Sequence, residues 1–188
     1  RFFDGDGLDI DASLQRKTER MLNREDFRRA FAADIGDIVF PPRSIEFYTA
    51  ALERSVDARR IRERALKVVL DYSHGAASVV MPSVLAKLGA DVLAVNPFAS
   101  TGPALLISDS RVRGEQLAPL VRASGSDLGF VIGPHGEEAT IVDDEGVVLD
   151  RDQALLLLVV LVARHHPGAR IALPVSTTAH AARLAAEH

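Results

Sequence analysis

The chain has 188 residues, of which 47% are hydrophobic and 26% charged, and its net charge is −4. This composition is that of an ordinary globular protein, and the length is sufficient for one full core and a piece of a second. This mildly acidic balance argues against a nucleic-acid-binding protein, which would carry a clustered basic face, and the absence of cysteine excludes disulfides and thiolate metal sites. No signal peptide is visible, and the longest apolar run, 154–163, is about half of the ~20 residues that a membrane span requires. We therefore expect a cytoplasmic protein in which this run forms a helix buried on all sides.

The first 40 residues predict a charged, largely helical segment. Residues 11–13 can cap a helix whose apolar stripe consists of Leu14, Thr18, Met21 and Leu22. Residues 24–31 predict a second short helix or a continuation of the first, and Pro41 and Pro42 then break the chain. A further helix is expected over 43–56.

From residue 66 onward, strand-like and helix-like segments alternate. We expect strands at 66–72, 91–95, 127–132 and 170–175, a further short strand at 104–108, and helices at 114–123, at 150–165 and in a segment that ends at Gly89. Residues 139–150 predict a β-hairpin whose turn carries Asp143, Asp144 and Glu145. Strands separated by helices form βαβ units. The predicted fold class is therefore α/β, a three-layer α/β/α sandwich with a mainly parallel mixed sheet.

Several of these segments carry a resemblance to a known family. LKVVLDYSHGAASVVMPSVLAKLGADVLAVN (66–96) resembles the first βαβ unit of domain II in the alpha-D-phosphohexomutases, the phosphomannomutase/phosphoglucomutase family. DLGFVI, VDDEGVVLD and the apolar helix after them resemble the second half of the same domain, in order and spacing. RFFDGDGLDID resembles the last strand of domain I and the helical stretch after it, and RIALPVSTT resembles the lead into domain III.

The resemblance implies a division of the chain. Residues 1–40 would be the truncated C-terminal tail of domain I, 41–175 domain II, and 176–188 the start of a linker or helix toward domain III. The chain would then be a fragment of a larger protein, and its first partners would be the remaining domains of that parent. If residues 1–3 are a strand cut from its domain, Phe2 and Phe3 have no strand to pair with. We expect them to be disordered or to pack on a neighbouring copy of the chain.

The resemblance also implies what chemistry to look for. In the family a phosphoserine donates and receives phosphate, and a DGDADR-like loop of domain II holds Mg²⁺ with three carboxylates. In the register fixed by the flanking strands, that loop becomes Gly133, Pro134, His135, Gly136, Glu137 and Glu138. Gly133 and His135 stand where the first two carboxylates would be, and Glu138 replaces the arginine. Mg²⁺ requires oxygen ligands. We therefore expect a degenerate loop without metal and no catalytic residue in this chain.

Two other interpretations of the candidate residues stay open. His135, Glu137 and Glu138 could bind a transition metal such as zinc, although a solvated turn is favoured, in which the glycines and Pro134 serve the backbone geometry. Ser73-His74 is the only Ser-His pair and lacks the Asn-Pro of the family's phosphoserine loop. We interpret it as part of a turn of small residues that lets a helix pack close to a strand.

Two classes of function are compatible with these residues. The first is a fragment of a phosphohexomutase that interconverts hexose 6-phosphate and 1-phosphate, with Mg²⁺ as the family's cofactor and none in this fragment. The second is a non-catalytic structural or regulatory module fused to a sugar-phosphate nucleotidyltransferase, such as mannose-1-phosphate guanylyltransferase. In either class hexose phosphate would bind only the complete protein, and neither nucleic acid nor membrane is expected as a partner. An unrelated nucleotide-binding domain is disfavoured because no GxGxxG motif is present.

Overall fold

The computed structural model describes residues 2–27, 29–100 and 109–187. The chain divides into two units, Arg1–Pro42 and Arg43–His188. Among the described residues, no helix combines the length and the apolar character that crossing a membrane demands.

The first unit consists of a hairpin, one helix and an extended segment. In the hairpin, Phe3 forms an antiparallel bridge with Asp9, so the expectation that Phe2 and Phe3 have nothing to pair with is wrong. Helix α1 (Ala12–Asn23) begins where the Asp11 carboxylate accepts hydrogen bonds from the Ser13 and Leu14 backbone amides at 2.7 and 3.0 Å. A hydrogen bond from the Ser13 side chain, followed by those from the Leu14 and Ser13 backbone amides, lowers the pKa of Asp11. The second helix predicted at 24–31 is wrong: the described residues there are not helical, and only the short 3₁₀ helix η1 (Ala32–Asp34) follows.

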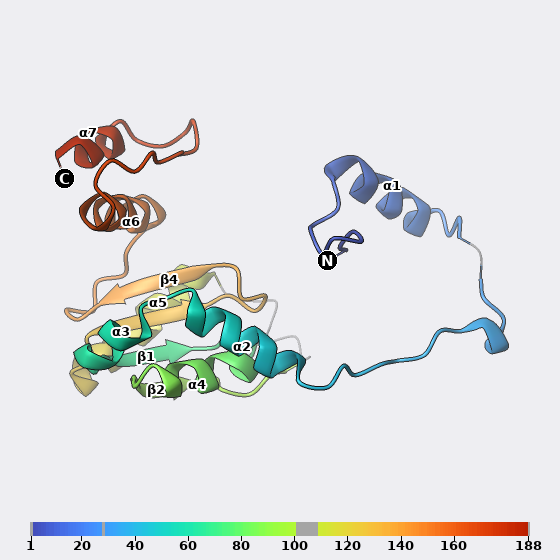
Figure 1. Cartoon of the computed structure of the whole chain (residues 1–188), viewed down its shortest axis with the longest axis horizontal. Helices are drawn as coiled ribbons and strands as arrows, with labels where there is room; N and C mark the ends of the chain where they lie inside the picture. Colours follow the sequence, from blue (N-terminus) through green and yellow to red (C-terminus); the bar gives the residue numbers. More distant parts are fainter. Residues whose placement is uncertain (1, 28, 101–108, 188) are drawn as a thin grey trace. The chain divides into compact units, whose positions relative to one another are not determined.

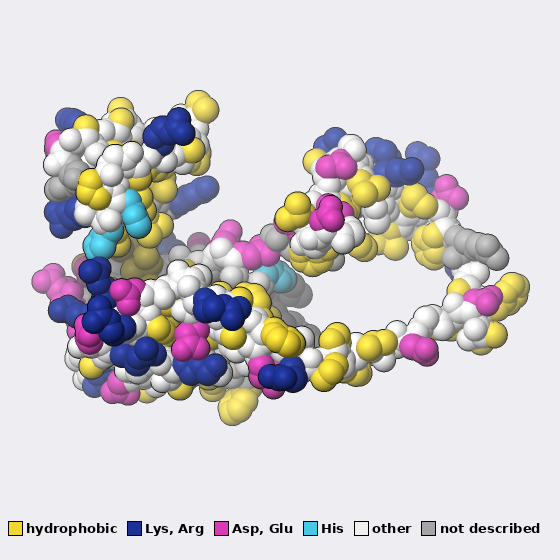
Figure 2. All heavy atoms as spheres, viewed as in Figure 1, with side chains coloured by type: hydrophobic (Ala, Val, Ile, Leu, Met, Phe, Trp, Pro, Cys, Tyr) yellow, Lys and Arg dark blue, Asp and Glu magenta, His cyan; other side chains and the backbone are white. Residues whose placement is uncertain are grey.

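Apolar side chains of the first unit lie at its surface, as Figure 2 shows. Phe2 and Phe3 are 61% and 60% exposed. Exposure is greater still in the segment before Pro42, where Ile38 and Phe40 are 84% and 85% exposed. That Phe2 and Phe3 pack on a neighbouring copy of the chain stays a prediction.

The second unit contains a four-stranded mixed sheet with the order β2-β1-β3-β4 (Figure 1). The central strands β1 (Lys67–Asp71) and β3 (Leu128–Ile132) are parallel to each other, and β2 (Asp91–Val95) is parallel to β1. β4 (Ala139–Asp143) runs antiparallel to β3. An antiparallel bridge between Val142 and Val148 pairs β4 with the segment that follows its turn. The strands predicted near residues 66, 91 and 127 and the predicted hairpin are thereby confirmed.

Helices cover the two faces of this sheet. α5 (Ser110–Ser124) packs on β1, β3 and β4, whereas α4 (Ala77–Lys87) contacts β2 and α2 (Ser44–Arg54). α3 (Ala58–Arg64) links α2 to β1 (Figure 1). The core under α5 consists of Val69, Leu117, Ala118, Val121, Val131 and Val142. The predicted three-layer α/β sandwich is confirmed.

Gly129 sets how closely α5 approaches the sheet. A Cβ atom at this position of β3 would lie 2.5 Å from Val121 Cγ2 and 3.2 Å from Leu117 Cδ2. The absent side chain therefore lets Leu117 and Val121 rest directly on the strand backbone, which is one of the positional uses of glycine within a sheet.

Two elements near the C-terminus differ from expectation. The strand predicted at 170–175 does not form, and Val175 is fully exposed. A strand requires a neighbour to satisfy its backbone, and β4 pairs only with β3 among the named strands. The apolar helix α6 (Arg151–His165) is not buried on all sides, because only Val159 and Ala163 are buried and Leu158 is 53% exposed. Its packing partner is α7 (His180–Glu187). The strand predicted at 104–108 lies outside the described residues.

Capping residues explain where α6 begins and where α5 ends. Asp150 and Gln153 form a reciprocal capping box, in which the Asp150 carboxylate accepts from the Gln153 amide at 2.8 Å. The side-chain oxygen of Gln153 accepts from the Asp150 amide at 2.9 Å. At the C-terminal end of α5, Gly125 has φ +61°, a left-handed conformation that stops the helix.

Burial of Tyr72 gives a prediction for alkaline pH. The side chain is 1% exposed, and loss of solvation raises its pKa above the ordinary value of 10.0. In a Tyr48→Phe variant, Tyr72 is the only remaining tyrosine, and we expect its ultraviolet titration midpoint to lie above pH 10. The native state then holds a proton that the unfolded state loses. Stability contributed by this burial is therefore complete below pH 10 and falls as the pH rises through the raised pKa. A midpoint at the ordinary value would contradict this expectation.

Candidate functional site

The strand-to-strand loop at residues 133–138, called here the 133–138 loop, follows the carboxyl end of β3. Ligands of open α/β sheets usually bind at this edge. The loop closes through a hydrogen bond from the Gly133 amide to the Glu138 carbonyl at 2.8 Å, and the Gly136 amide donates to the Gly133 carbonyl at 2.9 Å. Gly136 has φ +76°, which favours glycine. The loop is thus a closed turn within a β-hairpin.

The turn after β1 contacts this loop directly. The Ala76 amide donates a hydrogen bond to the Pro134 carbonyl at 3.1 Å. A Cβ atom at Gly75 would lie only 2.4 Å from the Pro134 oxygen and 2.6 Å from its Cα. The small residue at position 75 is therefore required by the neighbouring loop, whereas the sequence had suggested only close packing of the following helix.

A buried carboxylate lies at the base of the same turn. Asp71, the last residue of β1, is 4% exposed. Its Oδ1 atom accepts a hydrogen bond from the Ser73 amide at 2.7 Å and one from the Asn96 side chain at 2.9 Å. The guanidinium of Arg113, on α5, lies 3.9 Å from Oδ2. Residues from the ends of β1 and β2 and from α5 thus converge on one carboxylate.

Two non-glycine residues in this turn have left-handed backbone conformations. Ser73 has φ +50° and His74 has φ +55°. The His74 ring is tied to the segment after β2 through a 3.1 Å hydrogen bond between Nδ1 and the Phe98 carbonyl. Such conformations persist only where the surroundings enforce them. The Ser-His pair is therefore a constrained turn.

The side chains of the 133–138 loop do not fit a magnesium ion. His135, Glu137 and Glu138 are exposed, whereas Gly133 offers no side chain. In the part of the chain that the structure describes, no three histidine or acidic residues come together as metal ligands. Mg²⁺ needs near-octahedral oxygen coordination, and this donor set does not supply it. The same observation gives no support to a zinc site at His135, Glu137 and Glu138. That the chain binds no metal stays a prediction.

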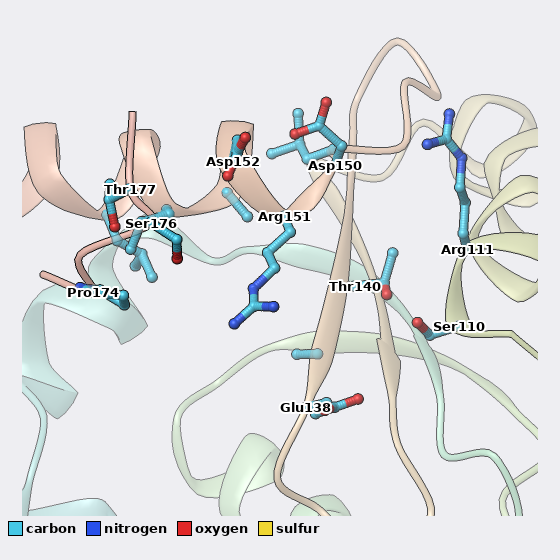
Figure 3. A pocket seen from close by; sticks show the side chains of 15 residues that line it. Ser110, Arg111, Glu138, Thr140, Asp150, Arg151, Asp152, Pro174, Ser176 and Thr177 are labelled. Carbon is cyan, nitrogen blue, oxygen red and sulfur yellow. The ribbon is translucent and has the colours of Figure 1, made fainter. Parts of the chain in front are cut away.

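A cavity of about 760 Å³ lies at the same edge of the sheet and was not foreseen (Figure 3). It is lined by the starts of β4, α5 and α6 and by the segment after residue 173, with Arg111, Glu138, Thr140, Arg151, Asp152 and Thr177 among its polar residues. Figure 3 shows Arg151 and Asp152 leaving α6 in different directions. Because these segments are distant in the chain, no local motif could have indicated the cavity. Its mixture of positive and negative charges does not define one class of ligand.

Comparisons with known proteins were consistent with this geometry. The sequence model described as phosphoglucomutase/phosphomannomutase, alpha/beta/alpha domain II, matches residues 46–146. The chain is 30% identical over 159 residues to a phosphoglucosamine mutase from Symbiobacterium thermophilum. The aligned region covers 84% of this chain and 34% of that protein. It is 26% identical over 188 residues to a phosphoglucomutase/phosphomannomutase from Thermococcus kodakarensis, covering 95% of this chain and 39% of that one.

A solved structure gives the same fold. The crystal structure of a phosphoglucomutase/phosphomannomutase family protein from Burkholderia thailandensis superposes with a TM-score of 0.70 at 19% identity. The match covers 95% of this chain and 37% of that one. The chain spans about a third of the length of the curated relatives that it matches.

Proposed function

The chain belongs to the phosphoglucomutase/phosphomannomutase family, and we propose that it contributes α/β/α domain II to a protein of hexose-phosphate metabolism, as a domain that holds no magnesium ion and is inactive by itself. The family is supported by the match over 46–146. The substrate class is supported by relatives whose names are phosphoglucosamine mutase and phosphoglucomutase/phosphomannomutase.

The proposal that the domain holds no magnesium ion rests on the residues of the 133–138 loop. This loop sits where the family places its metal loop, between β3 and β4, yet Gly133 and His135 bring no carboxylate to it. Phosphoryl transfer depends on positioning and on neutralising the charge of the transferred group. A domain that holds no cation at this place cannot supply that neutralisation. We therefore expect this chain by itself to convert no hexose phosphate.

A calorimetric titration with Mg²⁺ tests the proposal. We expect no binding to the unmodified chain at micromolar concentrations, because one carboxylate and one imidazole cannot replace the hydration shell of the ion. The combined variant Gly133→Asp, His135→Asp and Glu137→Asp is expected to bind Mg²⁺, since the loop backbone is already closed. The matched control carries asparagine at the same three positions and should not bind. Micromolar affinity of the unmodified chain would show that the loop is a working metal site.

A second candidate is a non-catalytic mutase-like module joined to a sugar-phosphate nucleotidyltransferase. The same loop favours it, because a module with a purely structural or regulatory role needs no magnesium ligands. The two candidates differ in the activity of the complete protein. Mutase activity of that protein on a hexose phosphate supports the first, and it requires that the neutralising charge come from outside the 133–138 loop. Nucleotidyl transfer to a sugar 1-phosphate without mutase activity supports the second.

A further inference from the structure

We propose that Asp71 and Gly75 are positioning residues that hold the 133–138 loop in its closed shape, so that the loop is formed in advance of any ligand. The inference rests on the proposed function, since it treats the loop as a metal-binding loop that has kept its backbone conformation and lost its ligand side chains. Three sets of contacts carry it.

The first set joins Gly75 and Ala76 to Pro134. The Ala76 amide donates to the Pro134 carbonyl at 3.1 Å, and Gly75 leaves no space for a side chain against the Pro134 backbone, since a Cβ there would lie 2.4–2.8 Å from three of its atoms. Pro134 is the second residue of the loop. Its place is therefore fixed from the outside by the turn after β1.

The second set holds that turn. Ser73 and His74 both have positive φ, and the Gly75 amide closes the turn by donating to the Tyr72 carbonyl at 2.8 Å. The buried Asp71 carboxylate accepts from the Ser73 amide at 2.7 Å. Two adjacent left-handed residues are unfavourable without such a fixed acceptor, and backbone strain of this kind points to a positional role.

The third set ties the same turn to β2. The Asn96 side chain donates to Asp71 Oδ1 at 2.9 Å, and the Ser100 amide donates to the His74 carbonyl at 3.0 Å. The Tyr72 amide also donates to the Val95 carbonyl at 3.1 Å. The turn thus bridges β2 on one side and the 133–138 loop on the other, and Asp71 is the common acceptor at its base.

Amide hydrogen exchange followed by nuclear magnetic resonance on the whole chain tests this directly. The reporters are the Ala76 amide, bonded to Pro134, and the Gly133 amide, bonded to Glu138. In Gly75→Ala we expect both to exchange about tenfold faster or more, while amides in the β1–β3 ladder keep their rates. The matched control is Gly36→Ala, because Gly36 has open space around it and no positive φ. Unchanged exchange at Gly133 in Gly75→Ala would overturn the inference.

Two Asp71 variants give a second measurement that does not depend on Gly75. Asp71→Ala removes the acceptor of the Ser73 amide and should also accelerate exchange at Ala76 and Gly133. Asp71→Asn keeps an oxygen that can accept this bond, and we expect it to restore most of the protection. Equal rates in Asp71→Ala and the unmodified chain would overturn the role of Asp71, whatever the effect of the variant on global stability.

The failure of this inference and that of the proposed function are distinguishable. Binding of Mg²⁺ by the unmodified chain contradicts the proposed function and leaves the exchange result standing. Unaltered exchange in Gly75→Ala or in Asp71→Ala contradicts the inference for that residue and leaves the magnesium result standing. In the triple-aspartate variant, adding Gly75→Ala is expected to weaken Mn²⁺ affinity at least about tenfold, measured by the electron paramagnetic resonance signal of the free ion.

Discussion

Leu117→Ala is expected to lower the free energy of unfolding of the second unit by about 3 kcal/mol. Leu117 is 2% exposed and belongs to the cluster between α5 and the sheet. Its Cδ2 atom rests beside the backbone of Gly129, where no side chain can move in to fill a cavity. The loss therefore includes both the transfer of the removed methyl groups and an unfilled void. Urea unfolding followed by far-ultraviolet circular dichroism measures the change.

Leu120→Ala is the matched control for this variant. Leu120 lies on the same helix and is 41% exposed, so the same chemical change removes few buried contacts. We expect it to alter stability by no more than about 0.5 kcal/mol. Equal effects of the two substitutions would show that the face of α5 toward the sheet has been assigned incorrectly.

The strands of the sheet could be predicted because each has the residue composition of a strand and also has a neighbouring strand with which it pairs. β1 is an apolar, β-branched run whose last four residues are all buried, as a central parallel strand should be. β3 alternates between buried and half-buried residues, and its neighbour β4 returns antiparallel after a six-residue loop that begins with Gly133. Local composition and the required pairing agree at these positions, which is why the sequence pattern was sufficient.

The segment after residue 150 shows where pattern alone fails. An apolar helix predicts burial only if partners surround it, and α6 packs on α7 while Leu157, Leu158 and Leu161 remain 40–53% exposed. Residues 170–175 have strand composition but no pairing strand in the described part of the chain. Hydrophobicity reports what a segment can bury. The neighbours that would bury it are set by the rest of the fold.

Some features of the candidate site could likewise be predicted from the sequence, and others could not. The place of the 133–138 loop follows from the register of its flanking strands, and the missing carboxylates can be read from the sequence. The contact between Gly75 and Pro134 could not be predicted, because it joins two turns through backbone atoms and leaves no sequence motif. Asp71 was equally inconspicuous, since an aspartate at the end of a strand is usually solvated.

Asp71→Ala is expected to destabilise the second unit by about 3 kcal/mol, because it removes a buried carboxylate that accepts two hydrogen bonds and lies beside a half-buried guanidinium. The Ser73 amide and the Asn96 side chain lose their acceptor, and the Arg113 side chain, 13% exposed, loses the carboxylate at 3.9 Å. The control is Asp91→Ala, at the exposed start of the edge strand β2, where a change of about 0.5 kcal/mol or less is expected.

The double variant Asp71→Ala with Arg113→Ala separates the two parts of this cost. If the loss of the ion pair with the half-buried Arg113 guanidinium dominates the cost of Asp71→Ala, the double variant should cost less than the sum of the single variants. If the unsatisfied Ser73 amide and Asn96 side chain dominate instead, the two costs should add. An Asp71→Ala variant as stable as Asp91→Ala would contradict both, because a buried carboxylate that accepts two hydrogen bonds cannot be removed without leaving their donors unpaired.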